Sequence, residues 1–188
     1  MNPEKHATHT SLAARDRILR TAHDLFYRDG VRATGIDRII AESGVTKVTF
    51  YRHFSSKNNL VRAYLDYRHR EWISWFSDTL ARYGGCPDAI VLTMEEWLRT
   101  PSYRGCAFIN SVGELSDALP EVAQIARNHK EAMIAAIALV LPAVHQRVEL
   151  ARTVALAMDG AIVRAQFDDT PDFALNALKR IIKSLLIE

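Results

Sequence analysis

The chain has 188 residues, of which 48% are apolar and 24% charged, and its formal net charge is +2 at pH 7. This composition is sufficient for a substantial core and excludes a disordered tail. The two cysteines, Cys86 and Cys106, are too few for a disulfide-rich fold and lack the Cys-x-x-Cys or paired-His spacing of a zinc site. We therefore expect no metal, and the lack of a Gly-rich phosphate loop predicts no cofactor.

The start of the chain lacks the apolar run of a signal peptide, and no later segment supplies the ~20 uninterrupted apolar residues of a membrane span. We therefore expect a cytoplasmic protein with no membrane partner. Residues 1–10 are polar and rich in His and Thr, which predicts a mobile arm. Residues 1–57 carry 10 Lys and Arg against 6 Asp and Glu, whereas residues 58–188 carry 14 against 16, so the basic excess is N-terminal.

Apolar residues at helical spacing predict the first two helices. The first of them ends at Gly30. The second follows a Thr34-x-x-Asp37 pattern, whose hydroxyl and carboxylate can both serve the unpaired amide groups of a helix start. The two apolar stripes consist of Ile18, Leu19, Ala22, Leu25 and Phe26 in the first helix, and of Ile36, Ile39 and Ile40 in the second.

The chemistry of the next few residues predicts a turn and a third, short helix. Gly44 can adopt the left-handed conformation that often ends a helix, and Val45 can pack between the helices. Thr46 is a good N-cap, so the third helix should begin near Lys47. The pattern is typical of a helix-turn-helix, and double-stranded DNA is the partner it indicates.

The third helix presents an outward face suited to the major groove of DNA. With Phe50 and Phe54 turned inward, Val48 and Arg52 point outward and Thr49 lies on the flank. Arginine can bind a guanine edge or a phosphate, and valine can contact a thymine methyl. An ordinary surface helical hairpin is the alternative. The predicted DNA contacts are Thr46, Lys47, Val48, Thr49, Tyr51, Arg52, His53 and Lys57.

Residues 17–60 resemble the N-terminal domain of TetR-family transcriptional regulators, through LF-x-x-x-G and GV-x-K-x-T-x-Y-x-HF-x-x-K. Val48 stands where many members carry Gly, and Ile40 where many carry Ala. The resemblance implies a homodimer on a palindromic operator. It also implies a repressor that a small-molecule effector releases from DNA.

The rest of the chain predicts helices and no strand, with a break at Gly84-Gly85-Cys86-Pro87. We therefore expect an all-α fold, in which a three-helix DNA-binding domain (1–57) precedes a roughly six-helix ligand-binding and dimerisation domain (58–188). Its helices are expected over residues 58–82, 88–99, 107–117, 120–141, 149–166 and 172–186.

The last two expected helices carry apolar stripes that fit an association surface. Burial within one subunit is the alternative, which periodicity alone favours slightly. The resemblance favours the dimer, because TetR-like proteins pair through a bundle of two helices from each chain. The predicted interface consists of Val154, Ala155, Met158, Ile162, Leu178, Ile181, Ile182 and Leu185.

Aromatic residues gather between positions 72 and 108, where a regulator could bind a small apolar or aromatic effector. An ordinary aromatic core is the alternative. Residues 103–110 also match a YRGCxFxN signature of one branch of TetR-like proteins, in which Cys106 is either a buried apolar residue or a redox-sensing or electrophile-sensing thiol. The predicted pocket consists of Trp72, Phe76, Trp97, Tyr103, Cys106, Phe108, Asn110 and Glu114.

Three hypotheses for the function follow from these patterns. The first is an effector-responsive repressor, and the second is a DNA-binding protein without an effector. The third is an enzyme built on Cys106, His129 and Glu114, which would require a Cys–His hydrogen bond in an open cleft. The resemblance favours the first, and we expect no enzymatic activity.

Overall fold

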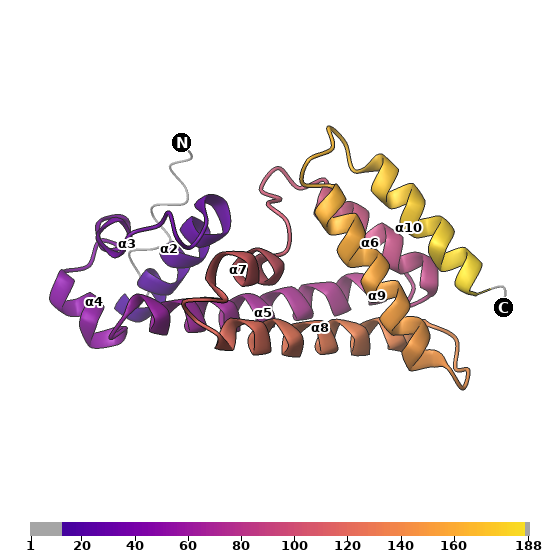
Figure 1. Ribbon diagram of the computed structural model, residues 1–188, viewed down its shortest axis with the longest axis horizontal. Helices are drawn as coiled ribbons and strands as arrows, with labels where there is room; N and C mark the ends of the chain where they lie inside the picture. Colours follow the sequence, from indigo (N-terminus) through magenta and orange to yellow (C-terminus); the bar gives the residue numbers. More distant parts are fainter. Residues whose placement is uncertain (1–12, 187–188) are drawn as a thin grey trace.

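The computed structural model describes residues 13–186, and these form nine helices and no strand, as predicted (Figure 1). The mobile arm predicted for residues 1–10 lies outside the described residues. Most helix ends fall within two residues of the predicted positions. The helices are α2 (Ala14–Asp29), α3 (Ile36–Ser43), α4 (Lys47–His53), α5 (Lys57–Arg82), α6 (Pro87–Leu98), α7 (Ala107–Leu115), α8 (Glu121–Val140), α9 (Arg147–Arg164) and α10 (Asp172–Leu185).

Helices α2, α3 and α4 pack together at one end of the molecule (Figure 1). Helix α3 does not use the cap predicted from Thr34 and Asp37. Its N-cap is Gly35, which has no side-chain hydrogen bond. The Thr34 hydroxyl is fully buried and donates to the Gly30 carbonyl at 2.7 Å, because a buried donor needs the nearest available acceptor.

Helix α5 connects this end of the molecule to the rest of the fold. It has 26 residues, and the Ser56 hydroxyl caps its start by accepting from the Asn59 amide. Its first turns pack on α2, where Tyr64 meets Phe26 edge to face at 5.3 Å between ring centroids. The helix then continues alongside α8 (Figure 1). One continuous helix therefore crosses the predicted domain boundary at 57/58, which stays a prediction.

Helices α9 and α10 form the far end of the molecule (Figure 1). They pack against each other, α10 also contacts α6, and α9 contacts α8. In the described part of the chain, no helix has the length and apolar character needed to cross a membrane.

Candidate nucleic-acid interface and sensing region

The turn before α4 has the geometry expected of a helix-turn-helix. Gly44 has φ 64°, a left-handed conformation that glycine adopts without strain. The Thr46 hydroxyl accepts from the Thr49 amide at 3.1 Å and so caps α4, as predicted. Phe50 and Phe54 are buried and fix the orientation of the helix.

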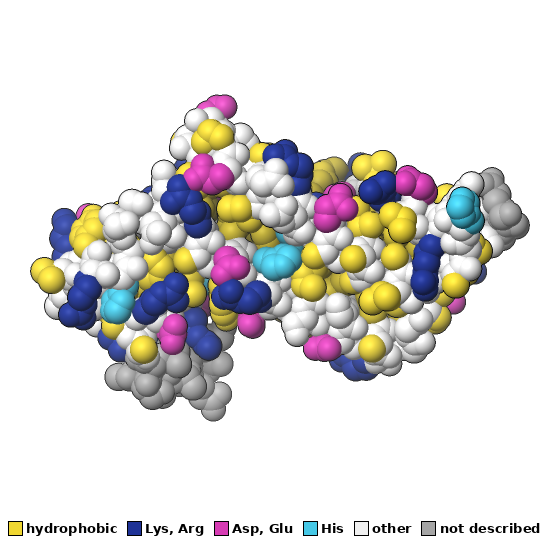
Figure 2. All heavy atoms as spheres, turned by 90° about the horizontal axis from the view of Figure 1, so that it is seen from below, with side chains coloured by type: hydrophobic (Ala, Val, Ile, Leu, Met, Phe, Trp, Pro, Cys, Tyr) yellow, Lys and Arg dark blue, Asp and Glu magenta, His cyan; other side chains and the backbone are white. Residues whose placement is uncertain are grey.

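The outward face of α4 is free of internal partners. Val48 is 79% exposed, and Arg52 and Lys47 are exposed with no hydrogen bond or ion pair inside the described residues. Thr49 differs, because its hydroxyl lies 2.9 Å from that of Thr46 and is half-buried. Lys and Arg side chains gather at the end of the molecule that carries these helices (Figure 2).

Lys57 lies at the edge of this face. Its ammonium group donates to the Arg32 carbonyl at 3.5 Å. Burial lowers the pKa of Lys57, and the negative charge of Glu114 acts in the opposite direction. The ammonium group of Lys57 therefore already interacts with other groups of the same chain.

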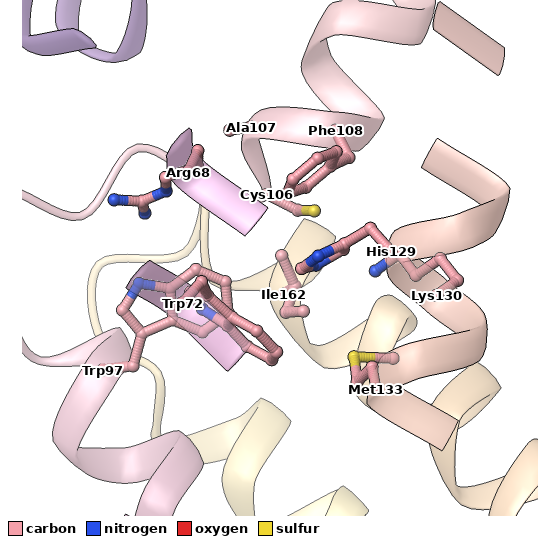
Figure 3. A pocket seen from close by; sticks show the side chains of 10 residues that line it. All are labelled: Arg68, Trp72, Trp97, Cys106, Ala107, Phe108, His129, Lys130, Met133 and Ile162. Carbon is pink, nitrogen blue, oxygen red and sulfur yellow. The ribbon is translucent and has the colours of Figure 1, made fainter. Parts of the chain in front are cut away.

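Six of the eight predicted pocket residues, all except Asn110 and Glu114, lie together around an aromatic cluster. Figure 3 shows Trp72, Trp97, Cys106 and Phe108 of this group. Trp72 stacks on Phe76 at 4.6 Å between centroids and meets Trp97 at 5.4 Å. Trp97 in turn meets Tyr103 at 5.4 Å. The small cavity beside them, also lined by Cys106 and Phe108, has a volume of about 10 Å³. That is space for about one water molecule, so the interior of the cluster is packed.

His129 completes the cluster, although it is not among the eight residues of the predicted pocket. It is 2% exposed and stacks on Phe108 with centroids 3.7 Å apart. Its Nδ1 lies 3.2 Å from Nδ1 of His69. Burial lowers the pKa of His129 to about 2, and the charges of Lys130, His69 and Arg68 act in the same direction. The imidazole is therefore neutral at physiological pH.

The other two predicted pocket residues lie elsewhere. Asn110 donates to the Arg104 carbonyl at 2.9 Å. Glu114 accepts from the Arg32 amide at 2.9 Å, at the junction with the N-terminal helices. Both border a separate hollow of about 180 Å³ and not the aromatic cavity. Their sequence proximity to the aromatic residues suggested the pocket, but α7 turns their side chains towards α2.

The YRGCxFxN segment links α2 to α9 by hydrogen bonds. The Tyr27 hydroxyl donates to the Gly105 carbonyl at 3.0 Å and accepts from the Arg104 amide at 3.1 Å. The Tyr103 hydroxyl donates to the Ile162 carbonyl at 2.5 Å. Gly105 has φ 84°, a left-handed conformation in which residues with a Cβ are strained, so the position favours glycine. The residues of the YRGCxFxN signature therefore have a structural role, which is to connect α2 to α9.

The catalytic arrangement considered for Cys106 is not assembled. Cys106 is 4% exposed and lines the small cavity together with His129, with no hydrogen bond between them in the described chain. Glu114 binds the Arg32 amide instead. Among residues 13–186, no group of His, Cys, Asp and Glu side chains could hold a metal ion.

The predicted interface residues mostly pack inside the subunit. Six of the eight, all except Ile181 and Leu185, are at most 4% exposed. They therefore have little surface to offer a partner. The same helices expose other apolar side chains at helical spacing, together with Phe167 in the loop between them. This α9–α10 apolar face consists of Leu156, Val163, Phe167, Phe173 and Ile181.

A large open cleft lies between α2 and the α5–α6 side of the molecule. Its volume is about 660 Å³. Trp72 and Trp97 of the predicted pocket form part of its wall, and Tyr27 and Arg68 stand at the α2 side, where the guanidinium lies 4.3 Å from the tyrosine ring centroid. Neither Tyr27 nor Arg68 was identified from the sequence, since α2 and α5 meet only in the fold.

Comparisons with known proteins agree with this architecture. Residues 18–64 match the sequence model of the bacterial regulatory proteins of the tetR family. A solved TetR-family transcriptional regulator from Streptomyces coelicolor is 30% identical, with a TM-score of 0.79 over 92% of this chain and 96% of that chain. The chain belongs to the TetR family. The resemblance inferred from the sequence and the all-α fold are thereby confirmed.

Two curated relatives match shorter stretches. The HTH-type transcriptional regulator YerO of Bacillus subtilis (strain 168) is 40% identical over 53 residues, 28% of this chain and 18% of that protein. An HTH-type transcriptional regulator in the lacX 3' region of Lactococcus lactis subsp. lactis is 28% identical over 107 residues, 54% of this chain and 55% of that protein. The matches thus span about a fifth and about half of the length of these relatives.

Proposed function

We propose that the protein is a homodimeric transcriptional repressor that binds a palindromic operator through α4. In this proposal residues 1–57 bind DNA and residues 58–188 dimerise and sense an effector. The observation that carries it is the unpaired outward face of α4, with Lys47 and Arg52 free and Val48 79% exposed. Donors without internal partners suit phosphates and base edges, which supply acceptors.

The roles on this face follow from the contacts of each side chain. Arg52 and Val48 read base edges, and Lys47 neutralises phosphate. The Thr46 and Thr49 hydroxyls already bond to one another, so they position the helix start against the backbone. Tyr51, His53 and Lys57 flank the helix and contact phosphates.

The dimer forms through the α9–α10 apolar face. Leu156 and Val163 are seven residues apart on α9, so they share one side of the helix. The guanidinium of Arg164 lies 5.0 and 5.3 Å from the ring centroids of Phe167 and Phe173 at the edge of this face. Burial of such a surface against a second copy is favourable because it removes apolar area from water.

A small apolar or aromatic effector lowers operator affinity by binding in the C-terminal region. The open cleft beside Trp72 and Trp97 has the volume for such a molecule. The second candidate is a DNA-binding protein without an effector, favoured by the nearly filled cavity inside the aromatic cluster. The two differ in whether any small molecule couples to DNA affinity, and this coupling must be reciprocal.

Selection of duplexes from a random pool tests DNA binding without a known operator. Wild-type protein should enrich one palindromic sequence, whereas a Lys47→Ala/Arg52→Ala variant should enrich none. Arg70→Ala is a matched control, because Arg70 is exposed on α5 and pairs only with Asp66. A wild-type pool without a consensus would contradict the proposal. So would a consensus that the double variant still enriches.

A further inference from the structure

The open cleft brings together all three tryptophans of the chain. Trp72 and Trp75 come from α5 and Trp97 from α6, and their ring centroids lie 5.4 to 6.5 Å apart. The volume of about 660 Å³ falls within the range of small-molecule sites. Flat indole walls favour a planar aromatic ligand, because rings stack or meet edge to face.

Two side chains beside these walls, Trp72 and Arg68, carry N–H donors that the described chain does not fully satisfy. Trp72 is 6% exposed, and its Nε1 is buried with no partner in the described chain. Leaving such a donor unpaired costs free energy, so an acceptor supplied from outside is favoured. By contrast, the neighbouring Trp75 indole bonds to Glu96.

Arg68 is the second donor. Its guanidinium lies over the Tyr27 ring, and Nη1 is 3.4 Å from Nε2 of His23, but it forms no ion pair within residues 13–186. Arg68 and Trp72 are four residues apart on α5 and therefore share one face of the helix. Both residues also line the open cleft, so they border the same space.

The other charged side chains of the cleft already interact with neighbours or are exposed, and among them the Asp24 carboxylate lies 3.1 Å from Nδ1 of His23. Arg28 is held by Asp29, and Glu96 is held by Arg82. Arg104 donates to the carbonyls of Pro101 and Tyr103. The carboxylate of Glu71 has no ion pair in the described chain, but Glu71 is exposed and remains solvated.

We propose that this cleft binds an aromatic carboxylate, with the carboxylate on Arg68 and the Trp72 N–H and the ring between the tryptophans. An arginine fork binds a carboxylate through two parallel hydrogen bonds, which fixes the orientation of the ring. His23 and Tyr27 on α2 form the opposite wall. The ligand therefore contacts a helix of the DNA-binding end directly. An effect on operator affinity rests on the proposed function, whereas binding itself does not.

Calorimetric titration of the full chain without DNA tests the site, with 1-naphthoate as the probe and 1-naphthamide as its uncharged counterpart. Naphthoate should bind at one molecule per chain and at least tenfold more tightly than the amide. Arg68→Gln should remove this preference, and Trp72→Phe should weaken naphthoate binding while keeping an aromatic ring. Arg70→Gln, two residues from both Arg68 and Trp72 and therefore on another side of α5, is paired with Asp66 and should bind as wild type does.

Thermal unfolding followed by circular dichroism shows whether each variant is folded. If Arg68→Gln does not fold, the comparison of naphthoate with naphthamide on wild-type protein still tests whether the cleft prefers a carboxylate. No binding of naphthoate, equal binding of the amide, or tighter binding of 1-naphthylmethylammonium would each overturn the proposal. Naphthoate binding without any change in affinity for the selected duplex would leave the site standing and contradict effector control.

Discussion

The two exposed surfaces to which we assign DNA binding and dimerisation are opposite in chemistry. The outward face of α4 presents unpaired cationic and hydroxyl groups around one apolar side chain, Val48. The α9–α10 apolar face presents leucine, valine, isoleucine and two phenylalanines, with Arg164 at its edge. The outward face of α4 is complementary to a charged groove. The α9–α10 apolar face is complementary to another apolar surface.

This difference predicts how each surface responds to conditions. Binding of cations to DNA releases counterions, so it weakens steeply as salt increases. Association through buried apolar area does not weaken in this way as salt increases. The two surfaces can therefore be disabled separately, and four changes test whether they are independent.

The largest effect should come from Leu156→Glu. Leu156 is 74% exposed in the subunit, so the change should leave the fold intact. An unpaired carboxylate desolvated at the interface costs about 3–5 kcal/mol. Sedimentation should show folded monomers that bind the operator poorly, whereas Leu156→Ala should remain largely dimeric. A dimeric Leu156→Glu variant would place the interface elsewhere. A charge at Ile162, which is 1% exposed, should instead unfold the subunit.

Arg52→Ala should cost about 1–3 kcal/mol on the specific duplex if the guanidinium binds a base edge bidentately. Arg52 has no internal partner in residues 13–186, so the stability and the dimer should be unchanged. Fluorescence anisotropy on specific and random duplexes measures the difference. Equal losses on both would assign Arg52 to the phosphates.

Acid should destabilise the packing of α8 on α5 and α7 through His129. The unfolded chain binds this proton at the ordinary pKa of 6.5, whereas burial delays protonation in the folded state to about pH 2. Stability from the neutral imidazole is therefore complete above pH 6.5. It is lost as the pH falls below that value, by about 1.4 kcal/mol per unit. Urea unfolding at pH 7.5 and 5.5 should show this loss in wild type, and a folded His129→Gln variant should lose less.

Lys57→Ala should have the smallest effect. Its ammonium group is partly committed to the Arg32 carbonyl, and burial lowers its pKa. The variant should bind all duplexes somewhat more weakly, with a salt slope reduced by about one. A selective loss on the specific duplex would mean that Lys57 reads a base.

The α4 region could be predicted in detail because its determinants are local. Gly44, Thr46 and Phe50 act within a few residues of one another, and sequence spacing alone gives their roles. The predicted cap at Thr34 failed for a related reason. Spacing showed a possible capping hydroxyl, but burial of that hydroxyl beside the Gly30 carbonyl decided its partner.

The C-terminal region was less predictable because its contacts join distant segments. Periodicity showed that Met158 and Ile162 face an apolar environment but not that α8 and α10 of the same chain supply it. The aromatic cluster could be predicted, whereas its closure around His129 could not. The link from Tyr27 to Gly105 spans 78 residues, a separation that no local pattern reveals.

The length of α5 has a mechanical consequence. At 1.5 Å per residue, its 26 residues extend about 39 Å, from the DNA-binding end to the start of the turn before α6. A tilt of about 5° around one end would displace the other by about 3.4 Å, the rise of one base pair. In the proposed dimer, a lever of this length would convert a displacement the size of a side chain into a one-base-pair error in the spacing of the two α4 helices.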